Sequence, residues 1–113
     1  MTIVAPDSLQ SYALPGLQHR TLASTIALEV WSQSLAAGAS TPPHYHQCEE
    51  VVVVQRGSGN VICDGQSRSF GRGGALIFSA HEVHQIVNSG SEEMVLLAAL
   101  SESPARVFTP AGL

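Results

Sequence analysis

Charged side chains, cysteines and aromatic side chains are all scarce in this chain. Charged residues make up 12% of the 113 residues, aromatic residues make up 5%, and the formal net charge is −4. Because no run of Lys or Arg occurs, the chain lacks the basic surface that binds nucleic acid, and no nucleic acid is expected as a partner. The two cysteines, Cys48 and Cys63, are too few to indicate a disulfide framework.

Long apolar runs are also missing. No stretch approaches the roughly 20 apolar residues of a membrane-spanning helix, so no membrane partner is expected. Residues 1–6 show no basic region followed by an apolar core, which leaves no apparent secretory signal and makes the expected location cytoplasmic. Hydrophobic residues nevertheless make up 44% of the chain, and its length suits one domain over residues 1–113.

Short segments rich in β-branched residues follow one another along the chain, separated by turn residues. No segment has helical periodicity, so the pattern alone predicts an all-β sandwich or barrel. The unbroken run Val51–Val54 predicts a strand buried on both faces, and Asp64-Gly65 predicts a two-residue hairpin turn. Residues 1–18 and the tail 101–113 are expected to be irregular. The expected strands lie at 25–35, 50–55, 60–63, 66–70, 75–78, 83–88 and 93–100.

The most informative feature is a group of polar side chains that share one parity. Side chains alternate along an extended segment, so His44 and His46 point to the same face, and Glu50 keeps their even parity. Unpaired inside an apolar core, such groups would cost several kcal/mol each, and a bound cation is the simplest compensation. His84, followed four residues later by Asn88, adds a third imidazole.

The spacing of these residues resembles the two motifs of the cupin superfamily. The first motif is filled without a gap by Gly38, His44, His46, Glu50 and Gly57. The second motif is matched in part by Gly73, His84 and Asn88. It departs from the family pattern at Ser79, where Pro is expected, and at His81, where Gly is expected. The departures lie in the turn before His84, so they bear on the rim of the pocket more than on the fold.

The resemblance covers residues 26–100 and implies a cupin-type double-sheet jelly-roll barrel. It implies one divalent transition metal ion inside the barrel, and the donor set suits Fe, Mn, Ni, Zn, Co or Cu. The implied ligands are His44, His46, Glu50 and His84. The apolar wall of the pocket is expected to include Val52, Val54, Ile77, Ile86 and Leu97.

If the ion is six-coordinate, two of its positions stay open for oxygen atoms of a small molecule. In cupins this ligand set is associated with dioxygenases, so we expect a metal-dependent, dioxygenase-like oxidoreductase that acts on a small oxygen-chelating organic substrate. The alternatives are a non-catalytic cupin that binds or senses a small molecule, and a metal-dependent isomerase or lyase. No basic cluster marks an anion clamp, although Arg56, Arg68 and Arg72 could each contribute singly.

Four further residues are weaker candidates for a role in the site. Glu49 has the opposite parity to Glu50 and is expected to be a solvated charge at the rim. Cys48 is either a small filler or a thiol near the metal. His81 is either an exposed loop histidine or an acid–base group at the pocket mouth. If the protein is an enzyme, Glu50 and His81 are the expected catalytic residues. For His19 nothing indicates more than a surface role.

The low charge also leaves room for a buried contact between subunits. Small single-domain cupins are commonly dimeric, so a homodimer is expected. The N-terminal strands are the expected contact, because their apolar side chains lie on both parities. These side chains are Ile26, Leu28 and Val30 on one parity and Trp31 and Leu35 on the other.

Overall fold

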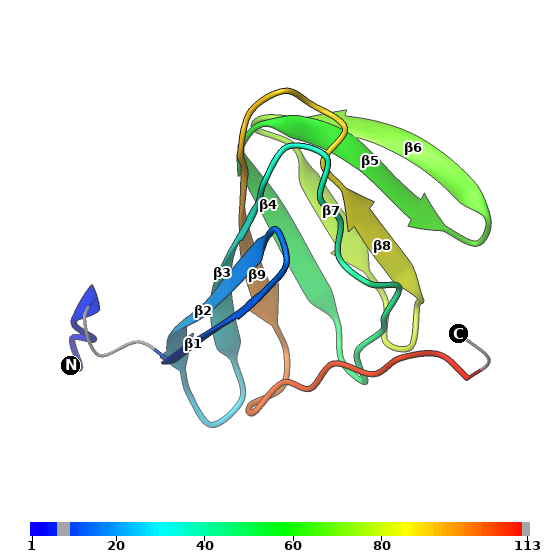
Figure 1. The fold of residues 1–113 in the computed structure, drawn as a ribbon. Coiled ribbons are helices and arrows are strands. Elements are labelled where there is room, and N and C mark those ends of the chain that lie inside the picture. The colour runs from blue at the N-terminus through cyan, green and yellow to red at the C-terminus, as the bar shows by residue number, and fades with distance from the viewer. Residues whose placement is uncertain (7–9, 112–113) are drawn as a thin grey trace.

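The structure is a computed structural model that describes residues 1–6 and 10–111 (Figure 1). Its named elements are nine strands, which confirms the expected all-β class. No helix in this part of the chain has the length and hydropathy to cross a membrane. The strands are β1 (Gln10–Leu14), β2 (Leu17–Ser24), β3 (Glu29–Leu35), β4 (Glu50–Arg56), β5 (Ser58–Cys63), β6 (Gln66–Gly71), β7 (Ala75–Phe78), β8 (His84–Val87) and β9 (Met94–Leu100).

The strands form two antiparallel sheets that pack face to face. The six-stranded sheet has the order β1-β2-β3-β9-β4-β7, and the three-stranded sheet has the order β6-β5-β8 (Figure 1). One buried hydrophobic cluster draws on both sheets, with Val52, Val54 and Leu96 from the first and Ile86 from the second. β7 ends one sheet and β6 ends the other, so the two sheets do not close into a continuous barrel.

Strand β4 departs from the expected burial on both faces. Val52 and Val54 are buried, whereas Val51 and Val53 are 39% and 40% exposed. The prediction was wrong because β-branched residues suit any strand, buried on one face or on two. Each fully buried branched side chain still contributes about 1.5–3 kcal/mol to folding. The outer face of the six-stranded sheet is therefore open in this chain.

The same open face explains two wrong wall assignments. Val52, Val54 and Ile86 lie in the core as expected, but Ile77 is 73% exposed. Leu97 pairs with Val53 across the β4–β9 ladder and so shares its outward face.

The N-terminal region is more regular than expected. Residues 10–18 were expected to be irregular, but β1 and most of β2 form a hairpin around Pro15 and Gly16. All five residues of β1 are exposed, so no hydrophobic alternation marks the strand in the sequence. Residues 7–9, also within the expected irregular segment, lie outside the described residues.

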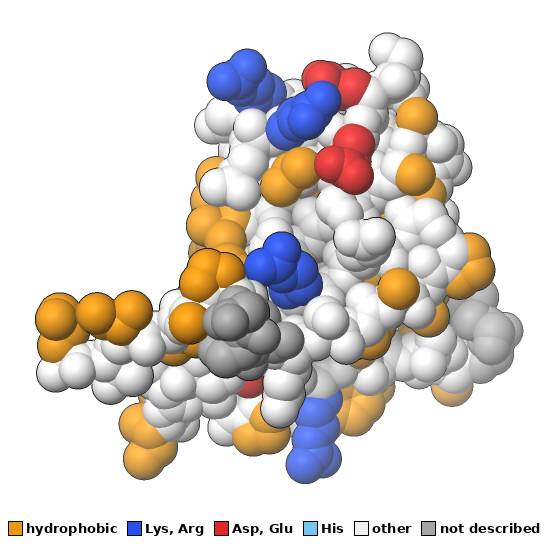
Figure 2. Space-filling model, turned by 60° about the vertical axis from the view of Figure 1, so that its left-hand side comes forward, with side chains coloured by type: hydrophobic (Ala, Val, Ile, Leu, Met, Phe, Trp, Pro, Cys, Tyr) orange, Lys and Arg blue, Asp and Glu red, His pale blue; other side chains and the backbone are white. Residues whose placement is uncertain are grey.

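One hairpin turn and the C-terminal tail agree with the sequence predictions. Asp64 and Gly65 both have positive φ, 52° and 71°, as a two-residue hairpin between β5 and β6 requires. Residues 101–111 belong to no named strand, in agreement with the expected irregular tail, while 112–113 fall outside the described part. Much of the surface in Figure 2 is uncharged, with charged side chains scattered over it.

Candidate metal centre

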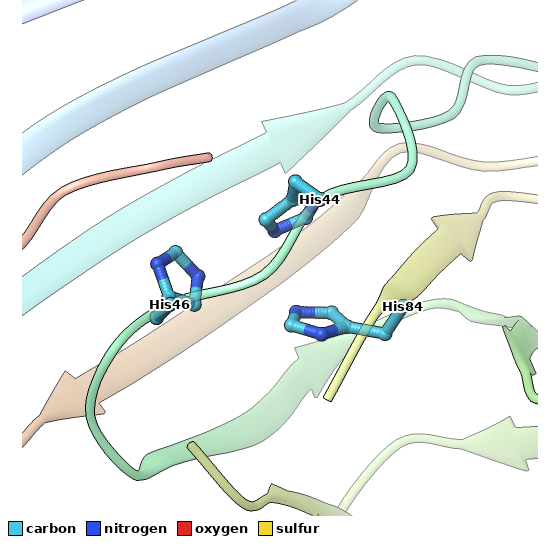
Figure 3. A group of neighbouring side chains, drawn as sticks. All are labelled: His44, His46 and His84. Atoms are coloured by element: carbon cyan, nitrogen blue, oxygen red, sulfur yellow. The ribbon is translucent and has the colours of Figure 1, made fainter. Parts of the chain in front are cut away.

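His44 and His46 lie in the connection between β3 and β4, beside strand β8. Here the His44 N–H donates to the His84 carbonyl at 3.0 Å, and the His84 N–H donates to the His44 carbonyl at 2.8 Å. Glu50 is the first residue of β4, in the facing sheet. This pairing places the three imidazole rings close together in the space between the sheets (Figure 3).

The structure brings the four predicted metal ligands together. The three histidines offer ring nitrogens that lie within 4.8 Å of one another. Glu50 Oε1 lies 3.4 Å from His46 Nε2 and 3.1 Å from His84 Nε2. The exposed fractions of His44, His46, Glu50 and His84 are only 9%, 2%, 4% and 1%. The group is therefore a compact polar cluster shielded from water.

Each imidazole is oriented by a hydrogen bond from Nδ1 to a backbone carbonyl. His44 Nδ1 donates to the Pro42 carbonyl at 2.7 Å, His46 Nδ1 to the Arg106 carbonyl at 2.7 Å, and His84 Nδ1 to the Glu82 carbonyl at 2.8 Å. A carbonyl oxygen only accepts, so each Nδ1 must carry the proton. In the neutral ring, Nε2 then carries a free lone pair, which is the state a metal ion binds.

Three atoms at the centre of this cluster are buried and lack a hydrogen-bond partner. They are His46 Nε2, Glu50 Oε1 and His84 Nε2. Leaving buried polar atoms unsatisfied costs about 1–3 kcal/mol for each atom. A divalent cation would satisfy all three at once, because imidazole nitrogen and carboxylate oxygen are both metal ligands. The residues present therefore fit a transition metal ion.

The ionisation of the cluster also suits a cation. Burial, reinforced by His84, lowers the pKa of His44 to about 4, so this ring is neutral at pH 7. Burial raises the pKa of Glu50, but the neighbouring His46 and His84 outweigh it and lower that pKa to about 2. Burial likewise opposes protonation of His46, yet Glu50 and the Arg106 carbonyl outweigh it and raise the pKa of His46. The ionised carboxylate thus concentrates negative charge where a metal ion would sit.

The C-terminal segment contributes a part of the site that the sequence did not reveal. Besides the Arg106 carbonyl on His46, residue Phe108 pairs with Tyr45 through two backbone hydrogen bonds of 2.9 and 3.0 Å. Their rings stack with centroids 5.4 Å apart. In Figure 1 this segment crosses one end of the two sheets. A backbone carbonyl can be supplied by any residue type, so no sequence signal could have identified it.

Two aromatic side chains pack against the histidines. The Phe78 ring lies flat on the His84 ring, with centroids 3.7 Å apart and an interplanar angle of 8°. Trp31 meets His46 edge-on at 5.6 Å. Trp31 also contacts His19 at 4.6 Å, and His19 is buried, so the expected surface role of His19 was wrong. These rings exclude water from the cluster.

The remaining candidate residues lie outside the cluster. Glu49 is exposed, as its parity predicted, while Cys48 is buried within the hydrophobic core, which favours its role as a small filler. His81 is exposed, and its backbone N–H donates to the His46 carbonyl at 2.7 Å. Its φ of +67° is unusual for a residue other than glycine, which explains why the cupin pattern has Gly at this position.

Asn88 supports the fold beneath the site. Its Nδ2 donates to the carbonyls of Leu35 and Glu92, each at 2.9 Å, and its Oδ1 accepts from the Gly90 N–H at 3.0 Å. Asn88 is fully buried. These bonds make Asn88 a hydrogen-bonding residue directly after strand β8.

Comparisons with known proteins agree with this geometry. A family model described as a cupin domain matches residues 31–100. Auxin-binding protein 1 of Arabidopsis thaliana is 32% identical over 112 residues, which cover 87% of this chain. The chain spans only 57% of that relative's length.

Solved structures show the same fold. The polyketide cyclase RemF of Streptomyces resistomycificus superimposes with a TM-score of 0.77 at 20% identity, over 99% of this chain and 88% of its own. An oxalate oxidase superimposes with a TM-score of 0.74 at 18% identity, over 82% of this chain and 54% of its own. With the motif spacing, the buried histidine cluster and the family match in agreement, the chain belongs to the cupin family.

Proposed function

We propose that this cupin holds one divalent transition metal ion through His44, His46, Glu50 and His84. The observation that carries the proposal is the set of three Nδ1–carbonyl hydrogen bonds, which leave the Nε2 lone pairs free. Two of those Nε2 atoms and Glu50 Oε1 are buried without another partner. Three nitrogen donors and one carboxylate oxygen suit Fe, Mn, Ni, Zn, Co or Cu.

The first test is the metal content of protein purified without added metal. His46→Ala should abolish binding, because it removes a donor from the centre of the cluster. Glu49→Ala is the matched control, since Glu49 adjoins Glu50 in sequence but is exposed, and it should retain the metal. Elemental analysis measures both. Equal loss from the two substitutions would show that Glu50 is not the carboxylate ligand.

Metal affinity should also fall as the pH drops from about 7 to about 5, because a protonated imidazole has no lone pair for the ion. Of His44 and His46, His46 is expected to take up a proton first, since its pKa is raised while that of His44 is lowered to about 4. Glu50, with a pKa of about 2, stays ionised over this range. Metal titrations at several pH values measure the affinity, which should decrease as the pH falls.

For the activity itself, we propose a dioxygenase-like oxidoreductase that acts on a small organic molecule with metal-chelating oxygen atoms. A bound redox-active ion would supply Lewis acidity and one-electron chemistry. The chain supplies three imidazole donors, each oriented by a hydrogen bond from Nδ1 to a backbone carbonyl, and the negative charge of Glu50. It also supplies the Phe78 and Trp31 rings, which exclude water. Water exclusion strengthens electrostatic interactions inside a site and limits side reactions.

A second candidate function is non-catalytic binding of a small molecule. It is favoured by the match to auxin-binding protein 1 over most of this chain. The same metal centre would then hold a ligand without changing it. Both candidates require the metal, and only the first requires turnover.

Oxygen consumption separates the two functions. Protein loaded in turn with Fe(II), Mn(II), Ni(II) or Cu(II) should consume dioxygen with at least one member of a panel of enolic and phenolic compounds. His46→Ala protein serves as the control for uptake by free metal. Calorimetric binding of a panel compound to metal-loaded protein, with no oxygen uptake and the compound recovered unchanged, would favour the binding protein.

We propose Glu50 and His81 for proton transfer within the dioxygenase-like function. Glu50 lies at the centre of the cluster, and His81 is tied through its backbone to the His46 carbonyl. The His81 ring lies 6.0 Å from that of Tyr45, at the end of the sheets that the C-terminal segment crosses. Histidine is the side chain most often used as an acid–base group in catalysis, and the exposed His81 ring is accessible to a bound molecule.

Two substitutions at His81 separate its side chain from its backbone conformation. His81→Ala should keep the metal content and lower turnover by about 10²-fold, the usual size for a lost acid–base group. His81→Gly should lower turnover equally but raise thermal stability relative to His81→Ala, because only glycine adopts a φ of +67° without strain. Full activity in both variants would leave His81 as an exposed loop residue.

The expected homodimer remains a proposal. Within its expected contact, Ile26 and Leu28 are 99% and 53% exposed and stay available. Trp31 and Leu35 are buried in the core and offer no surface. Val30 instead lies in register with Ala99, Val51 and Ile77 across four strands of the six-stranded sheet. This row is apolar and uncharged, so two copies can meet on it without charge repulsion. We therefore place the dimer contact on the outer face of that sheet.

Light scattering at micromolar concentration should report a dimer mass for the native chain. Val53→Asp should convert it to a monomer, because the carboxylate would be buried at the contact. Ile62→Asp is the matched control, since Ile62 is 37% exposed against 40% for Val53 but lies in the other sheet. A monomeric mass for the native chain would refute the contact.

A further inference from the structure

A cavity of about 350 Å³ lies between the free edges of the two sheets, away from the four proposed metal ligands. Strands β5, β6 and β7 line it, and β6 and β7 each end a sheet. Its apolar wall includes Val61, Phe70, Leu76 and Phe78, and its polar lining includes Arg68 and Glu82. The volume is at the lower end of the range for small-molecule sites, about 300–1,000 Å³, and suits a compact organic molecule.

The two charged groups of the cavity differ in what they already bind. Glu82 is engaged, because its Oε1 accepts the Ser79 backbone N–H at 3.1 Å. Arg68 makes no ion pair within residues 1–6 and 10–111, whereas Arg56 is paired with Glu92 at 3.3 Å. A guanidinium presents a planar fork of donors that matches a carboxylate. Arg68 is therefore the group in this cavity that has a free charge-binding fork and no ion-pair partner within the described residues.

We infer that the cavity binds a small amphipathic organic anion, with its apolar body against Phe70, Leu76 and Phe78 and its single carboxylate on Arg68. The inference goes beyond the proposed metal function and does not depend on it, because no proposed metal ligand lines the cavity. Burial of the apolar body provides affinity, and the guanidinium provides selection for charge. A neutral molecule of the same shape would lose the second contribution.

The cavity is nevertheless one aromatic ring from the metal centre. Phe78 lines the cavity, and its ring also lies flat against the His84 ring, with the two ring centroids 3.7 Å apart. A molecule held here contacts the ring that backs a proposed metal ligand. The site therefore lies close enough to the centre for its occupant to bear on that ligand's position.

Cinnamate and cinnamamide test the charge selection, because the two share a ring and a chain and differ in charge. We expect calorimetry on the full chain to show that cinnamate binds at least tenfold more tightly than cinnamamide. Arg68→Ala should remove this preference, because it removes the charged hydrogen-bond donor; a tenfold preference corresponds to about 1.4 kcal/mol. Arg72→Ala is the control, since Arg72 is also exposed but does not line the cavity, and it should keep the preference.

Methyl resonances locate the bound molecule. Cinnamate should shift the signals of Val61 and Leu76, which line the cavity, and leave those of Val53 on the outer sheet face unchanged. Equal binding of cinnamate and cinnamamide would overturn the inference. So would a preference that survives in Arg68→Ala or is lost equally in Arg72→Ala.

One further variant separates this site from the metal centre. In His46→Ala, which should lack metal, cinnamate binding and its dependence on Arg68 should remain. If cinnamate binding disappears with the metal, the anion sits on the ion, so the cavity inference fails while the proposed metal site stands. If the native chain contains no metal but binds cinnamate through Arg68, the metal proposal fails and the cavity inference stands.

Discussion

The candidate site depends on three hydrogen bonds between imidazole Nδ1 atoms and backbone carbonyls. The carbonyls belong to Pro42, Glu82 and Arg106, which lie in three segments that are distant in the sequence. Each bond selects one tautomer and turns the other nitrogen toward the shared centre. The metal-ready state is therefore a property of the folded backbone as much as of the histidines. It forms only when the β3–β4 connection, the turn before β8 and the C-terminal segment are all in place.

The sequence predicted the part of the site that follows from side-chain parity and motif spacing. His44 and His46 lie two residues apart in an extended segment and so share a face, whereas Glu50 reaches the cluster from the facing sheet after bends at residues 47 and 48. The cupin resemblance implied that His84 joins them, but their backbone bridge was not predicted. The Arg106 carbonyl was missed because backbone acceptors leave no trace in residue identity. The stack of Phe78 on His84 was missed because it joins two strands whose relative position is a tertiary property.

The sequence predicted the positions of most strands better than it predicted which of their faces are buried. Strand β1 is exposed along its whole length, so its sequence lacks the alternation that marks a half-buried strand. Strand β4 is a β-branched run, and such a run is compatible with burial on one face or on two. Only its position in the six-stranded sheet shows that Val51 and Val53 face outward. Both errors concern what covers a strand, which local sequence does not encode.

The proposed metal site and the side cavity share two structural elements: the Phe78–His84 stack, and Glu82, which lines the cavity and accepts from His84 Nδ1 through its carbonyl. One end of the His84 ring is held by the Glu82 carbonyl, and its Nε2 lies 3.1 Å from Glu50. One face is covered by Phe78, which also lines the cavity. Close-packed rings in a protein interior leave no free volume between them, so Phe78 can shift only by breaking the stack or moving His84. A molecule in the cavity would therefore touch two residues that contact His84, the Phe78 ring and Glu82, and any effect of it on the proposed metal site would pass through them.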